Sequence, residues 1–286
     1  MGFLHTVGYL GPEGTFSEVA AQRLGQAEEQ RQPFPTFFHL LDAVLQGQLD
    51  AAVIPVENST EGAVGATMDY LAQQEHTRSW LGIVREDVVP IHQTLATLPG
   101  VSLANITCII SHPQALAQCG RLLAQRFPHA TLREAASTAE AAQQVAARGD
   151  RLAAVLCPAK AAERFGLEIR IAEAEDEPGN ATRFLRVERA QTPWQIRGEK
   201  SSLAIRYPGE PDRPALLYET LRAFAEQSIN LTRLESRPTK TGLGTYWFWI
   251  DVDAGIHERR LVNALSAIQM AGARVRFLGS YPRAVP

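Results

Sequence analysis

The chain has 286 residues, enough for about two domains, and its 45% apolar content can fill a buried core in each. Its 28 basic and 31 acidic residues leave a formal net charge of −3 without a basic run among aromatics, so no nucleic-acid partner is expected. The sequence does not open with a basic segment and a long apolar run, and no later stretch reaches membrane-spanning length, which predicts a cytoplasmic protein. Cys108, Cys119 and Cys157 are widely spaced and the seven histidines are unpaired, which predicts buried free thiols and no metal site.

Strand and helix patterns alternate over the first 190 residues. Apolar runs predict strands at Thr6–Leu10, Ala51–Pro55, Ile106–Ser111, Arg151–Cys157 and Thr182–Val187. Helical spacing predicts helices at Ser17–Leu24, Leu40–Gln46, Ala115–Arg126, Ser137–Arg148 and Ala159–Phe165. This alternation is typical of α/β architecture with mostly parallel sheets.

The segment from Trp80 to Leu98 has extended patterns with no helix between them. We interpret it as a hinge between two α/β lobes, with the Thr182 strand returning to the first lobe. The predicted catalytic domain then spans 1–190, with hinge segments near 80–98 and 170–182. A two-lobed protein of this kind closes on its ligand from both sides, at the carboxyl ends of its strands.

A polar linker at 191–200 leads to a segment, 201–286, with its own complete pattern. The expected elements are strand Ser201–Tyr207, helix Ala215–Gln227, strands Asn230–Arg237 and Leu243–Val252, helix Glu258–Met270 and strand Arg274–Tyr281. The order βαββαβ is that of a ferredoxin-like domain. Trp247 and Trp249 fall on the face opposite the apolar set of their strand, and we expect another chain, rather than water, to cover that face.

The first polar constellation follows the predicted opening strand. Its spacing, G-x-x-G-x-x-G with Pro12 inside, argues against a dinucleotide site. The hydroxyls of Thr15 and Ser17 at a helix start still suit an anion, although Ser17 could simply cap its helix.

Further polar residues follow other predicted strands. Glu57, Asn58 and Ser59 come directly after a buried strand, a normal position for ligand groups in α/β sheets. Ser111 and Gln118 repeat the arrangement in the second lobe, whereas Ser137-Thr138, followed by Glu140, also fits helix initiation alone. An acidic turn at 175–179 leads into Asn180, Thr182, Arg183 and Phe184, and a hydroxyl beside a guanidinium at a strand start suits an anionic, hydroxyl-bearing substrate.

Together these motifs resemble the prephenate dehydratase family. The resemblance is carried, in chain order, by Gly11–Ser17, Pro55–Ser59, Ser111–Gln114 with Gln118, Ser137-Thr138, Thr182–Phe184, Ile229–Thr232, Glu235–Pro238 and Leu278–Pro282. It implies a two-lobed catalytic domain like the type II periplasmic binding proteins and a carboxy-terminal ACT regulatory domain. No chorismate mutase segment precedes Thr6, so the monofunctional form is expected.

The resemblance implies a decarboxylating dehydration of prephenate to phenylpyruvate, without a cofactor. Thr182 matches the family's central catalytic residue, and we expect it to serve the departing hydroxyl. Because a threonine is a poor acid, Glu57 is the expected proton source. Arg183 is expected to bind a substrate carboxylate, or else to pair with the acidic turn. The substrate-contacting candidates are Thr15, Phe16, Ser17, Asn58, Ser59, Ser111, Gln118, Ser137, Thr138, Asn180 and Phe184. Relatives often place an acid where this chain has Ala136, and the role of that acid is not transferred.

In the ACT domain the resemblance implies feedback by phenylalanine, bound between paired domains. Glu235–Pro238 matches one half of the binding motif, while the usual Pro-Gly-Ala-Leu half reads Pro214-Ala-Leu-Leu217 here. The methyl group of Ala215 and the larger Leu216 should crowd the ligand. The effector-binding candidates are Pro214, Ala215, Leu216, Leu217, Asn230, Leu231, Glu235, Ser236, Arg237 and Pro238.

Two alternatives stay open. Arogenate could replace prephenate as substrate, and a two-lobed fold with an ACT domain could serve a non-catalytic amino-acid sensor. By analogy a homodimer or homotetramer is expected.

Overall fold

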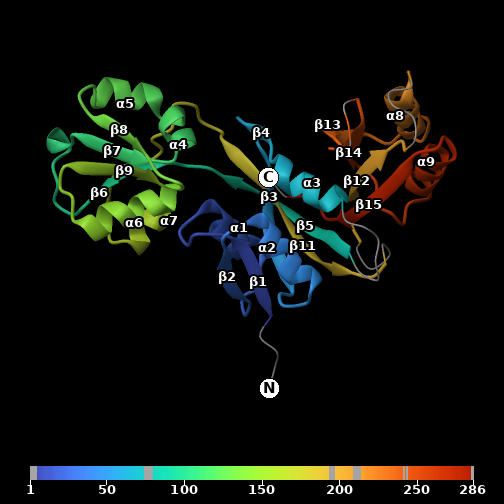
Figure 1. Cartoon of the computed structure of the whole chain (residues 1–286), viewed down its shortest axis with the longest axis horizontal. Helices are drawn as coiled ribbons and strands as arrows, with labels where there is room; N and C mark the ends of the chain where they lie inside the picture. The colour runs from blue at the N-terminus through green and yellow to red at the C-terminus, as the bar shows by residue number, and fades with distance from the viewer. Residues whose placement is uncertain are drawn as a thin grey trace.

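The computed structural model describes residues 5–73, 80–192, 197–208, 214–240, 242 and 244–284. These residues form three sheets with helices around them, in an elongated arrangement (Figure 1). A first lobe lies between a second lobe and a C-terminal domain. The expected two-lobed α/β architecture with a ferredoxin-like C-terminal domain is therefore confirmed.

The first lobe is built on a mixed sheet of order β2-β1-β3-β11-β5, with β4 beside β3. Its strands are β1 (Thr6–Leu10), β2 (Gln30–Phe34), β3 (Ala51–Asn58), β4 (Gly62–Ala63), β5 (Trp80–Pro90) and β11 (Ala181–Ala190). Helix α1 (Phe16–Leu24) packs on one face, with Phe184 in the shared core. Helices α2 (Phe37–Leu45) and α3 (Gly65–Gln73) pack on the other, with Leu185 and Val187.

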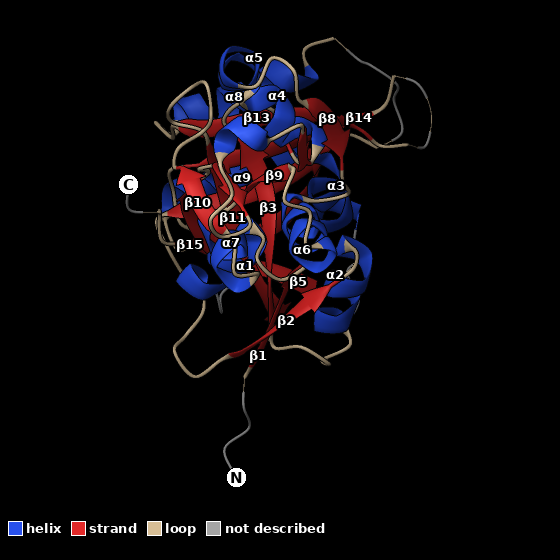
Figure 2. Ribbon diagram, turned by 90° about the vertical axis from the view of Figure 1, so that its left-hand side faces the viewer, coloured by secondary structure: helices blue, strands red, loops and turns tan. Residues whose placement is uncertain are grey.

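The second lobe has a sheet of order β10-β6-β9-β7-β8. Its strands are β6 (Thr94–Thr97), β7 (Cys108–Ser111), β8 (Thr131–Glu134), β9 (Ala153–Cys157) and β10 (Glu168–Ile171). Its helices are η1 (Leu103–Asn105), α4 (Pro113–Gln118), α5 (Gly120–Arg126), α6 (Thr138–Arg148) and α7 (Ala159–Arg164). Figure 2 looks onto this lobe, with β1 and β2 of the first lobe extending below it.

The chain crosses between the lobes twice, from β5 to β6 and from β10 back to β11. This path makes both sheets mixed, so the prediction of mostly parallel sheets is wrong. Strand β11 returns from the second lobe and is antiparallel to both β3 and β5, while β6 is antiparallel to β9 and β10. The crossings lie at 91–93 and 172–180, and the hinge role of these segments stays a prediction.

The C-terminal domain has an antiparallel sheet of order β13-β14-β12-β15. Its elements are β12 (Lys200–Arg206), α8 (Leu216–Glu226), β13 (Leu231–Pro238), β14 (Tyr246–Val252), α9 (Arg259–Met270) and β15 (Arg274–Tyr281), the predicted βαββαβ order. Leu243, the predicted start of β14, lies outside the described residues, as do 193–196 of the predicted linker. The boundaries at 190 and 200 stay predictions.

The second face of the C-terminal sheet packs on the first lobe. Trp247 and Trp249 are 4% and 0% exposed and share a core with Ile83, Leu185 and Val187. The face is covered, as expected, but the prediction that another chain covers it is wrong for these two residues. Gly279 of β15 makes the approach close, since an added Cβ would lie 2.2 Å from the carbonyl oxygen of Ile83.

Several elements differ from the sequence-based expectation. Strands β2 and β8 are polar and largely exposed, β10 is short, and α3 begins with a glycine, so their patterns were too weak to predict. Ser137 caps α6 as expected, accepting a hydrogen bond from the Glu140 amide. Ser17 does not cap α1; the Glu18 carboxylate instead accepts from the Gly14 amide at 2.6 Å. Cys119 and Cys157 are buried free thiols, and Cys108 is partly buried.

None of the helices in the described ranges combines the length and apolar character needed to cross a bilayer.

Candidate active site

A cleft of about 540 Å³ lies between the two lobes. Its lining comes from the ends of β1, β3 and β11, from the crossing after β5 and from two segments of the second lobe, 112–118 and 136–138. The predicted residues that line it are Thr15, Phe16, Ser17, Asn58, Gln118, Ser137, Thr138, Thr182 and Phe184. Residues far apart in the sequence thus meet around one space.

Thr182 lies at the start of β11, directly opposite Asn58 of β3. The Asn58 Nδ2 group donates to Thr182 Oγ1 at 2.9 Å and to Asn180 Oδ1 at 2.9 Å. Since the threonine oxygen already accepts this bond, its own hydrogen is left to donate elsewhere. The hydroxyl therefore presents a hydrogen-bond donor in the cleft.

A tight turn fixes the orientation of Asn58. Its Oδ1 accepts from the Thr60 amide at 3.0 Å, the Thr60 hydroxyl at 2.6 Å and the Glu61 amide at 3.1 Å. Three donors on the oxygen force the amide nitrogen toward Thr182, because a flipped side chain would set donor against donor. The Asn58 turn thus determines the direction of the Thr182 hydrogen.

Four helices begin at the wall of the cleft. The lining segments at or just before their starts are Thr15–Ser17 for α1, Gly62–Val64 for α3, His112 and Gln114 for α4, and Ala136–Thr138 for α6. Free backbone N–H groups and the positive end of the helix dipole favour negative charge at such places. No arginine or lysine lines the cleft in the part of the chain that the structure describes. The arrangement suits an anion held by helix starts and hydroxyls rather than by basic side chains.

The structure places three predicted substrate contacts outside the cleft lining. Ser111 is fully buried, and its hydroxyl donates to the Leu156 carbonyl at 2.6 Å. The hydroxyl of Ser59 accepts from the Ala181 amide at 3.0 Å and fastens the loop before β11. Asn180 is buried beside Asn58, and its Nδ2 has no partner. Ser111 and Ser59 are thus bonded within the protein, whereas Asn180 lines an adjacent pocket with Thr60 and Gln118.

The predicted proton source, Glu57, lies on the wrong side of the sheet. Neighbouring residues of a strand point to opposite faces, so Glu57 and Arg183 leave the face that carries Asn58 and Thr182. The Glu57 carboxylate lies 3.7 Å from Arg183 and 3.5 Å from Arg233 of β13. It does not line the cleft, and the predicted relay from Glu57 to Thr182 is therefore wrong.

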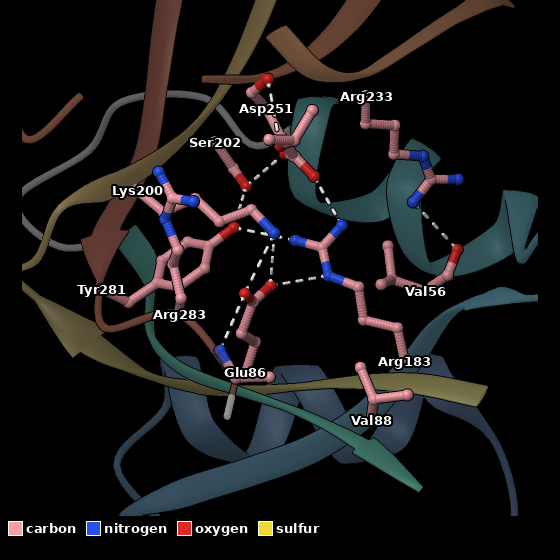
Figure 3. Close-up of polar contacts among 12 residues, drawn as sticks. Val56, Glu86, Val88, Arg183, Lys200, Ser202, Arg233, Asp251, Tyr281 and Arg283 are labelled. Carbon is pink, nitrogen blue, oxygen red and sulfur yellow. Dashed lines mark hydrogen bonds and ion pairs between the residues drawn. The ribbon is translucent and has the colours of Figure 1, made fainter. Parts of the chain in front are cut away.

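Arg183 belongs to a buried network at the junction with the C-terminal domain (Figure 3). Its Nε donates to Glu86 of β5 at 2.7 Å, its Nη1 to Asp251 of β14 at 2.5 Å and its Nη2 to the Tyr281 hydroxyl of β15 at 2.9 Å. Neither predicted role holds, since Arg183 does not line the cleft and its partners are not Glu175–Glu177. The acidic turn instead pairs with His92 and Arg121.

Cleft residues that the sequence analysis did not single out include His112, Glu61 and Gln93. The His112 Nδ1 accepts from the Gln114 amide at 3.3 Å, so in the neutral ring Nε2 carries the hydrogen. Gln93 is 3% exposed and its Oε1 has no partner. His112 was within reach of the sequence analysis, because it stands inside the Ser-His-Pro-Gln motif.

Two ion pairs join the lobes at one side of the cleft. Lys160 of α7 lies 2.9 Å from Glu18 of α1, and Arg164 pairs with Glu13. Gly14, between the two acids, allows the close approach of Ala161, from which an added Cβ would be 3.2 Å away. These contacts hold the lobes together around the cleft.

The effector-binding candidates lie on two elements of the C-terminal domain. Pro214–Leu217 form the start of α8, where Ala215 adopts a left-handed conformation with φ of 74°. Leu231, Glu235, Ser236, Arg237 and Pro238 belong to edge strand β13, and the Asn230 side chain donates to Asp253. Arg237 also reaches the first lobe, where its Nε donates to Asp69 of α3 at 2.9 Å. One effector candidate therefore contacts the helix that begins at the cleft.

Comparisons with known proteins identify the family of this chain. Residues 7–192 match the family model "Prephenate dehydratase". A prephenate dehydratase of Amycolatopsis methanolica is 39% identical over 280 residues, which cover 97% of this chain and 88% of the relative. The crystal structure of a prephenate dehydratase from Arthrobacter aurescens in complex with L-Phe has a TM-score of 0.87 at 36% identity, covering 98% of this chain and 90% of that one.

A further solved structure, GqqA, is described as a novel type of quorum quenching acylase. It has a TM-score of 0.84 at 27% identity, covering 99% of both chains. Because one fold can carry different chemistries, the activity has to be argued from the site. The family assignment follows from the sequence matches: this chain belongs to the prephenate dehydratase family.

Proposed function

We propose that this protein converts prephenate into phenylpyruvate, CO2 and water. The observation that carries the proposal is the Thr182 hydroxyl, fixed by Asn58 with its hydrogen free, in a cleft surrounded by helix starts. In this reaction the bond between the ring and its carboxylate breaks, its electrons enter the ring, and the hydroxyl at C4 leaves. The site must therefore bind two carboxylates and assist the departure of a hydroxide.

The starts of α1, α3 and α6 supply N–H groups for the two carboxylates, and their partial charges need no counter-ion from a side chain. Thr182 donates a hydrogen bond to the departing hydroxyl as negative charge develops on its oxygen. The position of the cleft between the lobes shields part of the substrate from water while the ring becomes aromatic. His112 and Glu61 are the titratable side chains among the residues that line the cleft, and we infer that the proton reaches the leaving group from one of them.

An absorbance assay for phenylpyruvate tests this function. The unaltered protein should turn over prephenate, and Thr182→Val, which keeps the shape and removes the hydroxyl, should lower kcat by about 100-fold or more. Thr182→Ser is the matched control because it restores a hydroxyl at the same atom. A folded protein that is silent on both prephenate and arogenate would contradict the proposal and favour an amino-acid sensor.

The preference for prephenate over arogenate is a separate proposal. The two compounds differ in their side chain, which carries a keto group in prephenate and an ammonium group in arogenate. Glu61, exposed at the wall of the cleft, is the carboxylate that could attract an ammonium group. Values of kcat/KM for both compounds, measured for the protein and for Glu61→Gln, decide between them.

We also propose that phenylalanine regulates this chain through its C-terminal domain. Support comes from the Glu235–Pro238 motif on β13 and from the L-Phe complex of the Arthrobacter aurescens relative. Turnover of prephenate should fall on addition of phenylalanine, with tyrosine and tryptophan as controls. No response to any of the three would overturn the regulatory role.

A cytoplasmic homodimer or homotetramer, with catalytic residues 1–190 and an ACT domain at 201–286, remains our proposal for the organisation of the protein. Support for pairing comes from β13, which lies at the edge of its sheet and can add a strand from another copy. Light scattering of the purified protein over a range of concentrations tests the oligomeric state.

A further inference from the structure

Thr182 and Arg183 are neighbours that point to opposite faces of the first lobe's sheet. Thr182 lines the cleft, while Arg183 enters the junction with the C-terminal domain. The peptide link between them leaves little freedom, because successive side chains of a strand alternate in direction. Whatever fixes the guanidinium of Arg183 therefore also fixes the start of β11.

Most of what fixes Arg183 comes from the C-terminal domain. Of its three hydrogen-bond partners, Glu86 belongs to the first lobe, whereas Asp251 and Tyr281 belong to the C-terminal sheet. Lys200 at the start of β12 donates to Glu86 at 2.8 Å and completes the charge balance. We call Arg183, Glu86, Lys200, Ser202, Asp251 and Tyr281 the junction network.

With Asp251 ionised, the hydrogens of the junction network can be assigned. Ser202 donates to Asp251 Oδ1 at 2.5 Å, so the Tyr281 hydroxyl donates to Ser202 and accepts from Arg183. The indole of Trp249 also donates to Asp251 Oδ1, at 2.8 Å, which leaves Oδ2 for Arg183. The ring of bonds closes only when Asp251 is an ionised acceptor.

Burial limits the alternative positions that the charged groups of the junction network can adopt. Asp251 is 0% exposed, and although burial raises the pKa of its carboxyl, the charge of Arg183 and the bond from Ser202 outweigh burial and hold that pKa below its usual range. An unpartnered guanidinium at such a place is costly, so Arg183 has no good alternative position. Gly279 holds β15 against the Ile83 backbone, which limits sliding at the junction.

We propose that Asp251 is a positioning residue for Thr182: the C-terminal domain supplies the counter-charge that holds Arg183 and, through it, the catalytic hydroxyl. The proposal rests on the role assigned to Thr182. It makes the C-terminal domain part of what organises the cleft, in addition to any binding of an effector.

Asp251→Asn tests the proposal by replacing one carboxylate oxygen with an NH2 group. The amide oxygen can still accept from Ser202 and Trp249, but an NH2 group then faces Arg183, donor against donor. Because small misplacements of a reacting group are costly, we expect kcat to fall by about 10- to 100-fold with a much smaller change in KM.

Glu29→Gln is the matched control. Glu29 is a buried carboxylate of the first lobe. It accepts a hydrogen bond at 2.7 Å from Arg186, which lies on β11 as Arg183 does. Both variants remove one charge opposite an arginine of β11, and both should lower the melting temperature. The control should keep kcat near that of the unaltered protein, and an equal loss of kcat in both variants would overturn the proposal.

Tyr281→Phe gives a milder second variant in case Asp251→Asn does not fold. It removes one hydroxyl bond to Arg183, so a smaller fall in kcat is expected, and unchanged kcat would count against the proposal. The methyl resonance of Thr182, assigned by its loss in Thr182→Val, gives a readout independent of turnover. It should shift in Asp251→Asn or Tyr281→Phe and not in Glu29→Gln, so a failure of the proposed reaction can be told from a failure of this inference.

Discussion

The cleft and the junction lie on opposite faces of the first lobe's sheet, and they accommodate charge in different ways. The cleft offers hydroxyls, amides and helix starts, with no arginine or lysine among its described lining residues. The junction face collects buried ion pairs around Arg183, together with Arg233 and Arg237 at β13. A substrate that brings its own negative charge needs donors that stay fixed in position, whereas a contact between domains can keep full charges because it supplies both signs.

Adjacent residues of a motif contact different sites because their side chains lie on opposite faces of the sheet. In Glu57-Asn58 and in Thr182-Arg183, one residue faces the cleft and its neighbour faces the junction. A motif that is continuous in the sequence is thus divided between two sites by the pleat of the strand.

The largest difference in kcat is expected between variants of the neighbouring residues Asn58 and Glu57. Asn58→Asp replaces the donor to Thr182 with an acceptor, so the threonine hydrogen turns toward the new carboxylate and away from the cleft. We expect kcat to fall by about 100-fold. In Glu57→Gln, on the other face, kcat should change little. Steady-state kinetics on both variants measures this, and equal losses would break the comparison.

The next effect concerns proton delivery within the cleft. His112→Asn keeps a side chain that can cap α4 and removes the imidazole. If His112 supplies the proton, kcat should fall by about tenfold or more, with its pH profile changed. Glu61→Gln is the companion variant. An unaltered profile in His112→Asn and a changed one in Glu61→Gln would move the assignment to Glu61.

A smaller effect is expected at the second ion pair of the junction, where Asp69 meets Arg237 and Lys240 at 2.9 and 2.7 Å. Burial raises the pKa of Asp69, but the hydrogen bonds from both cations outweigh it and leave the pKa lowered. A lowered folded pKa stabilises the protein above the unfolded value of about 4 and loses that contribution as pH falls.

Asp69→Asn should therefore lower the free energy of unfolding by about 1–2 kcal/mol near neutral pH, since Lys240 is mostly exposed. The difference from the unaltered protein should shrink below pH about 4. Urea unfolding at a series of pH values measures it. A difference that grows in acid would contradict the sign.

The smallest effect is expected at Ala215, whose φ of 74° is a conformation that glycine adopts without cost. Ala215→Gly should relieve about 1 kcal/mol of strain, partly offset by the greater freedom of the unfolded chain. The melting temperature should rise slightly, and calorimetry should show tighter binding of phenylalanine. A fall in melting temperature would show that the methyl group makes a useful contact.

Sequence periodicity predicted the elements with strong apolar patterns, and the capping of α6 by Ser137 was predicted correctly. It could not predict β8, whose four residues are all exposed, because such a strand carries no apolar signal. Of the residues that the motifs singled out, Thr182, Asn58, Gln118 and Thr138 do line the cleft, whereas the lining residues His112, Glu61 and Gln93 were not singled out. The misplacement of Glu57 and Arg183 has one physical cause: the face of a strand depends on register, and register depends on contacts distant in the sequence.

The burial of Trp247 and Trp249 also depends on contacts that are distant in the sequence. Alternation showed that a second face of the sheet needed cover. It could not show that the cover was the first lobe of the same chain, because that depends on how the two domains dock.

Strand β11 makes a residue of the first lobe dependent on a residue of the C-terminal domain. Arg183 and Asp251 stand 68 positions apart in the chain, yet replacing either one removes a buried ionic partner of the other. Descendants of this protein should therefore keep or exchange the two residues as a pair, and a homologue without the C-terminal domain would need a different partner for the residue after Thr182.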